Sequence, residues 1–360
     1  MLINLAAFVV IVAGMVSAKP LLIPFLLAIF MAIIFSPPVY WMRSKKVPVW
    51  LAITLVMVVV IALQVGITTM VGTSLAEFTR ALPQYQERMQ QLVHEGVVWL
   101  QGKGVHITDA AIMEQINPNR VFALVGNLVN SLLAMLKNTM MILLTFVFIL
   151  FEAAGIPTKL RAMARGSESP VEKYEEVIRG VNRYLGLKTL TSLLTGVCAW
   201  FTLVCIGVDY AILWGTTAFV LNFIPTIGSI IAAIPPIFLA LVQFGLGEAI
   251  TTAVIYFIIN IGISNLLEPR LMGSRVGLSA LVVFLAMAFW GWVLGPMGML
   301  LSVPLTMTLR IGLGSSEKTR HLALLLGSNA EAAASLKSHK SVGPPYFLKK
   351  RGEGEENSEE

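Results

Sequence analysis

The chain has 360 residues, of which 56% are hydrophobic and 13% are charged, and its mean hydropathy is +0.80. Ordinary soluble domains carry about 25% charged residues, so this composition excludes a typical water-soluble protein and indicates a membrane protein. The net charge is +6, but the basic residues lie in loops and the C-terminal tail, without the basic stripe and interleaved aromatics of a nucleic-acid interface, so nucleic acid is not an expected partner.

Apolar runs long enough to cross about 30 Å of hydrocarbon recur along the chain, and they lack the alternating polarity of membrane β-strands. The sequence therefore predicts an all-α, polytopic helical membrane protein. We expect about six spans plus two re-entrant helical hairpins, or alternatively eight spans, and a small helical arm outside the membrane. The six expected spans are 2–18, 20–40, 49–73, 129–151, 186–207 and 249–266.

The N-terminal region, residues 1–73, is predicted to contain three transmembrane helices. The first apolar stretch lacks the positively charged start of a secretion signal and runs into a second apolar stretch, so we retain it as a span. Arg43, Lys45 and Lys46 follow the second span without an acid, and the positive-inside rule places them in the cytoplasm. Two spans before this loop place the N-terminus in the cytoplasm as well.

Residues 74–128 are predicted to form an extracytoplasmic helical arm. Polar residues appear there at helical spacing, and Pro83, Gly102, Gly104 and Pro118 are expected to break the helices. Acids slightly outnumber bases in this segment, so it lacks the basic excess of a cytoplasmic loop.

Residues 129–185 are predicted to hold the fourth span and a basic cytoplasmic loop with amphipathic helices. Arg183, Tyr184 and Lys188 lie where the fifth span leaves the cytoplasm. We interpret these three residues as anchors at the membrane interface.

The transport core is predicted over residues 186–312, where two apolar segments have an unusual length. Residues 211–243 are broken by "NFIPTIGS" and by two later prolines, and residues 280–311 are broken by "GWVLGPMG" and Pro304. Each is too long for one straight span and too short for two, and proline and glycine favour a bend. We predict that each folds back as a re-entrant hairpin, with a single kinked span as the alternative.

Charge in the loop 266–278 favours the re-entrant arrangement, because Arg270 and Arg275 outweigh Glu268 and so place the loop inside. Each of the two spans 186–207 and 249–266 is then followed by a hairpin, and the two units have opposite orientations. Many secondary transporters are built in this way. The tail, residues 313–360, is predicted to be disordered and cytoplasmic.

Polar residues gather at the predicted breaks, and non-helical backbone at membrane depth indicates a binding site. An ionisable group in a membrane segment is a functional candidate, which singles out Glu268. If the helix persists that far, Asn265 lies on the same helix face as Glu268. The alternative interpretation of Glu268 is a structural ion pair with Arg270. Gln243 and Glu248 are expected at the mouth between the two units. The candidate substrate-pathway residues are Asn222, Pro225, Thr226, Gly228, Ser229, Asn260, Asn265, Glu268, Arg270, Pro296 and Gly298.

Enzymatic motifs are missing from the sequence: it has no His-Glu-x-x-His, no Gly-x-Ser-x-Gly, no Walker loop and no dinucleotide-binding glycine motif. Its histidines form no i, i+4 pair, and Cys198 and Cys205 are interpreted as packing residues. We therefore predict no enzyme, no catalytic residue, no metal site and no cofactor.

Three stretches resemble the AI-2E family of transporters: "WGTTAFVLNFIPTIGSIIAAIPP" (214–236), "NLLEPRLMG" (265–273) and "LVVFLAMAFWGWVLGPMGMLLSVPL" (281–305). The likeness extends from about residue 5 to 312. The resemblance implies a multi-pass inner-membrane protein that forms homo-oligomers, with pentamers as the family expectation. It also implies export of autoinducer 2 or, as in some members, exchange of sodium or lithium for protons.

Three functions remain open on the sequence. The first is a secondary carrier that exports autoinducer 2, a small polar signal suited to neutral side chains and backbone dipoles. The second is a sodium or lithium/proton antiporter with Glu268 as the titrating ligand, and the third is a scaffold that transports nothing. The expected partners are the lipid bilayer, a small polar solute or cation, and further copies of the chain.

Overall fold

The computed structural model describes residues 2–103, 126–127, 139–153, 155–156, 159, 169–272, 278–314 and 319–327. These residues form helices, and the only β-structure among them is an isolated bridge between Leu278 and Gly327. The all-α fold class is thus confirmed. Length and apolar composition make the chain a multi-pass membrane protein, with six helices of spanning length among the described residues.

Four of these six helices correspond to the predicted spans 20–40, 49–73, 186–207 and 249–266, and the other two are one arm of each predicted hairpin. The predicted span 2–18 is the shorter apolar helix α1 (Leu2–Ser17). Of the predicted span 129–151, residues 129–138 lie outside the described residues, and the rest belongs to α6 (Thr139–Ala153). The helices of spanning length are Lys19–Ser44, Val49–Trp99, Ile178–Ile206, Ile227–Phe244, Leu246–Leu271 and Pro296–Gly314.

Helix α2 (Lys19–Ser44), the first part of α3 (Val49–Gly102) and α6 form one packed body. Ala28 and Ala32 of α2 are buried with Ile53 of α3 and Phe146 of α6. Small residues on α2 let the neighbouring helices approach closely, which is the usual way of packing helices in lipid.

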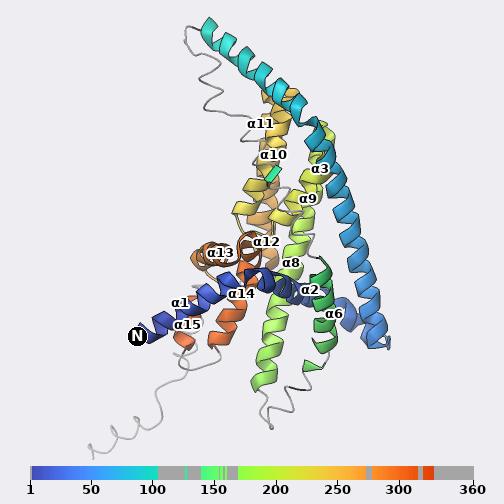
Figure 1. Ribbon diagram of the computed structural model, residues 1–360, viewed down its shortest axis with the longest axis vertical. Helices are drawn as coiled ribbons and strands as arrows, with labels where there is room; N and C mark the ends of the chain where they lie inside the picture. Colours follow the sequence, from blue (N-terminus) through green and yellow to red (C-terminus); the bar gives the residue numbers. More distant parts are fainter. Residues whose placement is uncertain are drawn as a thin grey trace, which may run out of the picture.

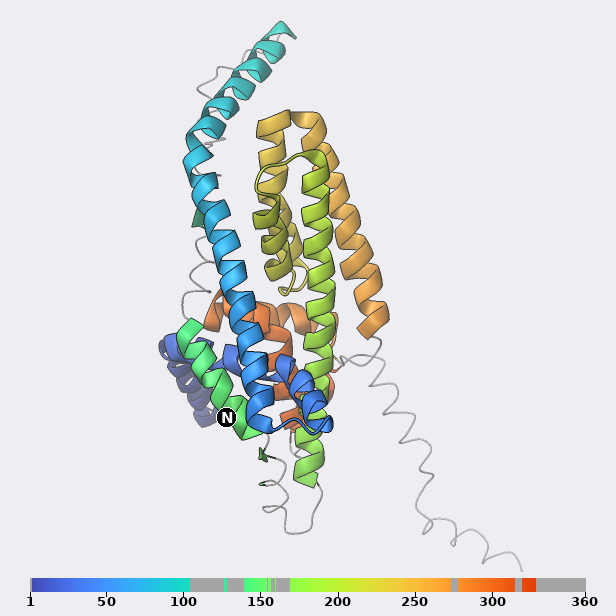
Figure 2. The same cartoon turned by 90° about the vertical axis from the view of Figure 1, so that its right-hand side faces the viewer.

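Helix α3 continues without a break from the predicted third span into the predicted arm (Figures 1 and 2). Its 54 residues measure about 80 Å at 1.5 Å per residue. The expected break at Pro83 is wrong, because Pro83 lies inside this helix. Proline removes one backbone hydrogen bond, and burial of Phe78, Tyr85 and Met89 on both sides of it offsets that loss. Gly102 ends the helix as expected. Residues 104–125 of the predicted arm lie outside the described residues, and so do the expected breaks at Gly104 and Pro118.

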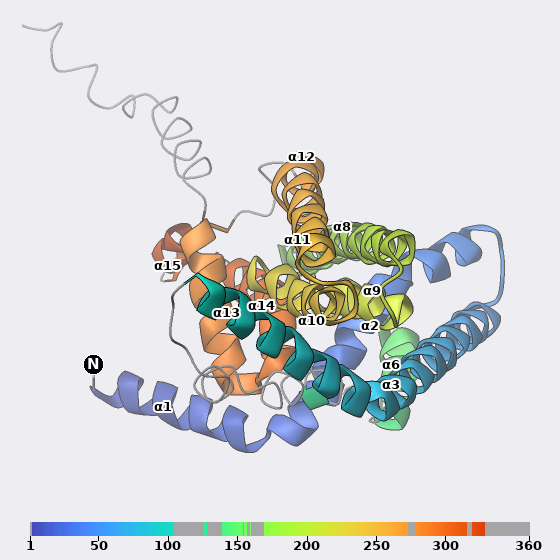
Figure 3. The ribbon, with the colours of Figure 1, turned by 90° about the horizontal axis from the view of Figure 1, so that it is seen from above.

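The core contains two helical hairpins, and seen from above α8, α10 and α11 lie together near its middle (Figure 3). Its elements in chain order are α8 (Ser169–Ile206), α9 (Ala211–Leu221), α10 (Ile227–Phe244), α11 (Leu246–Asn260), the π-helix η1 (Ile261–Leu267), α12 (Glu268–Met272), α13 (Ala280–Leu294) and α14 (Pro296–Gly314).

The first hairpin is formed by α9 and α10, which run antiparallel beside α8 (Figure 2); α9 packs against α8, and α10 packs against α11. The chain enters it after Gly207 and leaves it at Gly245, two glycines with positive φ of 90° and 100° that permit sharp turns. Both ends therefore lie at the same end of α8. The break predicted within 211–243 is confirmed, and the position of this hairpin in the membrane stays a prediction.

The second hairpin, α13 and α14, turns at Gly295 (φ 71°). The short helix α15 (Arg320–Leu325) holds its two open ends together, because the Ser279 amide donates to the Leu326 carbonyl (3.4 Å) and Arg310 Nε donates to the Ala323 carbonyl (3.3 Å). The expectation of disorder from residue 313 is thus wrong for residues 313–314, which end α14, and for residues 319–327, where packing on α14 offsets the ordering entropy. Residues 328–360 lie outside the described residues.

Candidate functional site

Asn222 joins three elements of the core. It is the C-cap residue of α9 and is only 2% exposed. Its Nδ2 donates to Ser192 Oγ of α8 (3.1 Å), and Ser264 Oγ of η1 donates to its Oδ1 (3.4 Å). We call these three residues the Asn222 bridge. The bridge holds the inner end of the first hairpin between the two long helices that flank it.

A buried ion pair lies one helical turn from the bridge. Lys188 Nζ donates to both carboxylate oxygens of Glu268 at 2.9 Å, and the two side chains are 4% and 16% exposed. Lys188 lies four residues before Ser192 on α8, and Glu268 lies four residues after Ser264, so bridge and ion pair share one face of each helix. Together they form a polar layer of no net charge within apolar helices.

The π-helix η1 aligns one side of this layer. Its wider turn closes i to i+5 hydrogen bonds, as in the bond from the Glu268 amide to the Ile263 carbonyl. The wider turn keeps Asn260, Ser264 and Glu268 close to one face, whereas an α-helix would rotate them progressively away. Asn265 is exposed, so the expectation that it shares a face with Glu268 is wrong, and Ser264 holds that place.

The tip of the first hairpin contains a strained turn. The Ile227 amide donates to the Pro225 carbonyl (2.6 Å) across Thr226, which has φ 61° and ψ −52°. These values describe a γ-turn of the rare, strained kind, and Ser229 Oγ supports it by donating to the Thr226 carbonyl (3.4 Å). Pro225, Thr226 and Ser229 therefore shape the tip, and Asn222 carries its contact to α8 and η1.

Both hairpins are closed by a glycine that lies against the preceding helix. A Cβ added to Gly228 would lie 1.8 Å from the Leu221 carbonyl oxygen, and one on Gly298 would lie 1.8 Å from that of Trp290. Only glycine fits so close to another backbone. Pro296, which begins α14, is exposed. No hydrogen bond among the described residues brings Pro296 or Gly298 to the Asn222 bridge.

Two charge assignments made from the sequence are wrong. Glu268 pairs with Lys188 rather than with Arg270, whose position is exposed. Lys188 and Tyr184 are buried instead of anchoring the interface, and only Arg183 is exposed there. Sequence reasoning missed Lys188, Ser192 and Ser264. A usable signal was present, since Lys188 and Ser192 are polar residues one turn apart in an apolar helix.

A second polar cluster fastens the base of the first hairpin to α3. The Tyr85 hydroxyl donates to Asp209 Oδ2 (2.7 Å). Gln243 Nε2 donates to the same carboxylate and to the Tyr85 hydroxyl (3.3 Å). The backbone amide of Asp209 donates to Gln243 Oε1 (3.2 Å). Asp209 precedes α9 and Gln243 lies in the last turn of α10, so one cluster ties both ends of the hairpin to the outer part of α3. Glu248, the other residue predicted at a mouth, is exposed.

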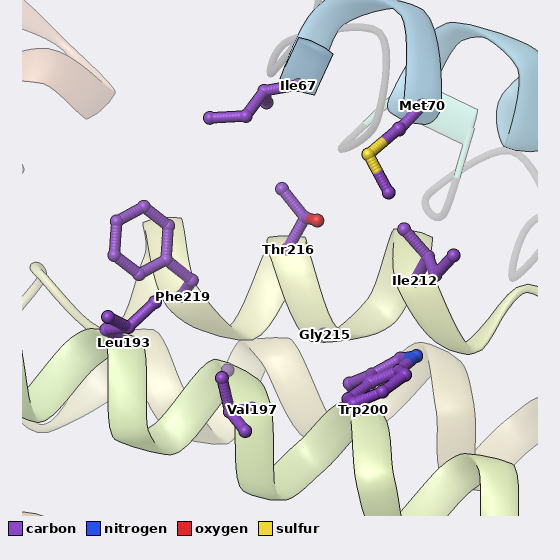
Figure 4. Close-up of a pocket in the computed structure, with 10 residues that line it drawn as sticks. Ile67, Met70, Leu193, Val197, Trp200, Ile212, Gly215, Thr216 and Phe219 are labelled. Atoms are coloured by element: carbon purple, nitrogen blue, oxygen red, sulfur yellow. The ribbon is translucent and has the colours of Figure 1, made fainter. Parts of the chain in front are cut away.

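An apolar groove lies between α3, α8 and α9 (Figure 4) and has a volume of about 320 Å³. Gly196 and Gly215 form its floor, where the two backbones cross: a Cβ on Gly215 would lie 2.7 Å from Trp200 Cβ. Its apolar lining does not suit a polar solute. A second cavity of about 610 Å³ adjoins it at Trp200 and Ile212, and its lining includes the polar residues Ser74, Glu77 and Asp209. Among the described residues, no three His, Cys, Asp or Glu side chains are grouped to hold a metal ion.

Comparison with known proteins places these features in a family. The model of the "AI-2E family transporter" family matches residues 5–316. A "Putative transport protein" of Haemophilus influenzae is 41% identical over 332 residues, which cover 91% of this chain and 95% of the relative. The Escherichia coli "AI-2 transport protein TqsA" is 39% identical over 324 residues, covering 90% and 94%. The E. coli "Putative transport protein YhhT" is 35% identical over 326 residues, covering 91% and 93%.

Proposed function

The chain belongs to the AI-2E transporter family, and from this membership we propose that it exports the small polar signal autoinducer 2. The named substrate of the E. coli relative TqsA, which is 39% identical along nearly the whole chain, supports this choice of solute. Other relatives of similar identity are named only as transport proteins, so the substrate rests on the chemistry of the site as well.

The observation that carries the proposal is the Asn222 bridge. Its amide and two hydroxyls are donors and acceptors that a hydroxylated solute exchanges for its hydrogen bonds to water, at a small net change in free energy. The nearby charges are already paired with each other, so the layer presents no unpaired charge that would favour an ion. A neutral, hydrogen-bonding solute fits this chemistry best.

The arrangement of the core supports alternating access as the mechanism. Each long helix, α8 or α11 to α12, is followed by a hairpin, and transporters of this plan bind their solute near the interface of the two units. Asn222 lies on the hairpin, whereas Ser192 and Ser264 lie on the flanking helices. We propose that the solute replaces Asn222 as their partner, which frees the hairpin to shift.

The proposed setting is the bacterial inner membrane. The outer part of α3 and the base of the first hairpin then face the extracytoplasmic side, and both termini face the cytoplasm, in accord with the basic loop at Arg43, Lys45 and Lys46. A homo-oligomer, with five copies as the family expectation, belongs to the same proposal. The many exposed apolar side chains of α1, α3 and α8 suit contact with lipid or with such copies.

The sodium or lithium/proton antiporter is the second candidate, and the buried Glu268 favours it. A cation that binds Glu268 must displace the Lys188 ammonium from both carboxylate oxygens, which ranks this function behind the exporter. A scaffold without transport ranks last, because it gives no role to a polar layer that joins α8, α9, η1 and α12.

Transport assays in proteoliposomes test the proposal. We expect Asn222→Leu to lower the flux of labelled autoinducer 2 about tenfold or more, the equivalent of about 1.4 kcal/mol, while assembly stays intact. Asn265→Leu is the matched control, because the same substitution at this exposed position leaves the bridge unchanged. Equal flux in both variants at equal reconstitution would contradict the site. A proton-coupled sodium flux that Glu268→Gln abolishes would favour the antiporter.

A further inference from the structure

A stripe of polar residues runs along α11, η1 and α12. Tyr256, Asn260, Ser264 and Glu268 follow one another at intervals of four residues. In a regular α-helix this interval drifts around the axis, since one turn takes 3.6 residues. The wider turn of η1 corrects the drift. Single π-type turns inside helices are frequent at functional sites, and here the turn extends the face of the Asn222 bridge to Tyr256.

The stripe faces the interior of the core. Tyr256 is 7% exposed, whereas its neighbours Phe257 and Ile258 are 64% and 61% exposed. Tyr256 belongs to the same buried cluster as Leu239 of α10 and Met287 of α13. It lies eight residues before Ser264, or about 12 Å toward the base of the first hairpin at 1.5 Å per residue.

The hydroxyl of Tyr256 is buried and has no hydrogen-bond partner among the described residues. A buried hydroxyl normally has one, as Thr252 shows one turn earlier on the same helix by donating to the Glu248 carbonyl (2.7 Å). Leaving the hydroxyl unpaired destabilises the folded protein, and phenylalanine would avoid this loss at the same volume. The hydroxyl is therefore expected to bond to a molecule that is not part of the chain.

We propose that the Tyr256 hydroxyl and the Asn260 amide form a second subsite for the transported solute, on the route from the Asn222 bridge toward the base of the first hairpin. This inference rests on the proposed function and extends it to a route with two stations. No charged side chain lies on the stripe between Tyr256 and Ser264. The subsite therefore selects uncharged solutes that carry hydroxyl or carbonyl groups.

Tyr256→Phe tests the subsite, because it removes the hydroxyl and nothing else. We expect the half-saturating concentration of labelled autoinducer 2 in proteoliposomes to rise about 3- to 10-fold, the effect of losing one neutral hydrogen bond. The melting temperature is expected to stay equal or rise. Asn260→Leu is the second variant, with the same expected rise in half-saturation. Thr252→Val is the control with unchanged transport, since its hydroxyl already bonds to its own helix.

The two proposals fail in different ways. If Tyr256→Phe and Asn260→Leu keep the parental half-saturation while Asn222→Leu loses flux, the subsite is overturned and the proposed function stands. If Asn222→Leu also transports like the parent, the proposed function itself is overturned. Should Tyr256→Phe fail to fold, the inference that its hydroxyl lacks a protein partner is refuted.

Discussion

The ion pair between Lys188 and Glu268 gives the sharpest prediction about stability. Both side chains are almost out of solvent, so replacing one partner leaves the other as an uncompensated buried charge. Such losses are typically about 3–5 kcal/mol. Lys188→Met leaves a carboxylate that is 16% exposed and is expected near the lower end of this range. Glu268→Leu leaves the ammonium, which is 4% exposed, and is expected near the upper end.

Removing both charges should reverse most of the loss. The double variant Lys188→Met with Glu268→Leu replaces the pair by apolar side chains, a change that is often neutral or stabilising by about 1–4 kcal/mol. The two single losses are therefore expected to be strongly non-additive. Thermal unfolding in detergent, followed through the fluorescence of the seven tryptophans, measures this cycle. We expect each single variant to melt about 5–10 °C below the parent and the double variant to melt close to it.

The reasoning fails if Lys188→Met melts with the parent, since the pair would then contribute nothing to the fold. It also fails if the double variant is no more stable than either single variant. Flux measured on the same preparations separates stability from transport, because the double variant restores folding without restoring the charges.

Three further predictions concern the hairpin. Gly228→Ala should prevent the first hairpin from closing and abolish the monodisperse peak in size-exclusion chromatography. Gly262→Ala is the control and should elute like the parent, because a Cβ added there meets nothing within 4 Å. Thr226→Gly should raise the melting temperature through relief of about 1 kcal/mol of backbone strain, and a lower value would refute the γ-turn. Tyr85→Phe removes the hydrogen bond to Asp209, which should lower stability by about 1–3 kcal/mol and speed amide hydrogen exchange in α9. Unchanged exchange would show that the cluster does not hold the hairpin.

The breaks in the core could be predicted from the sequence because their cause is local. Proline at 225 and glycine at 228 favour a turn whatever surrounds them, and the chain turns there. The length of α3 could not be predicted in this way. Pro83 is a local signal against a helix, and it is overridden by the burial of Phe78 and Tyr85 against a hairpin more than one hundred residues away in the chain.

The ion pair shows the same limit at the candidate site. Arg270 is two residues from Glu268 and was the natural partner on sequence distance, whereas Lys188 is 80 residues away. Only the packing of α8 against α12 brings the ammonium and the carboxylate together. The π-helix has a similar consequence, because its wider turn moves Ser264 rather than Asn265 into line with Glu268.

The central claim is that the solute binds at the bridge formed by Asn222, Ser192 and Ser264. The most direct test is the rate at which a small, water-soluble thiol reagent modifies Ser264→Cys in a chain whose Cys198 and Cys205 are replaced by alanine. The account predicts that the introduced thiol reacts and that autoinducer 2 slows its reaction in a saturable manner. A reaction rate that is the same with and without the signal, in protein that still transports it, would contradict the account.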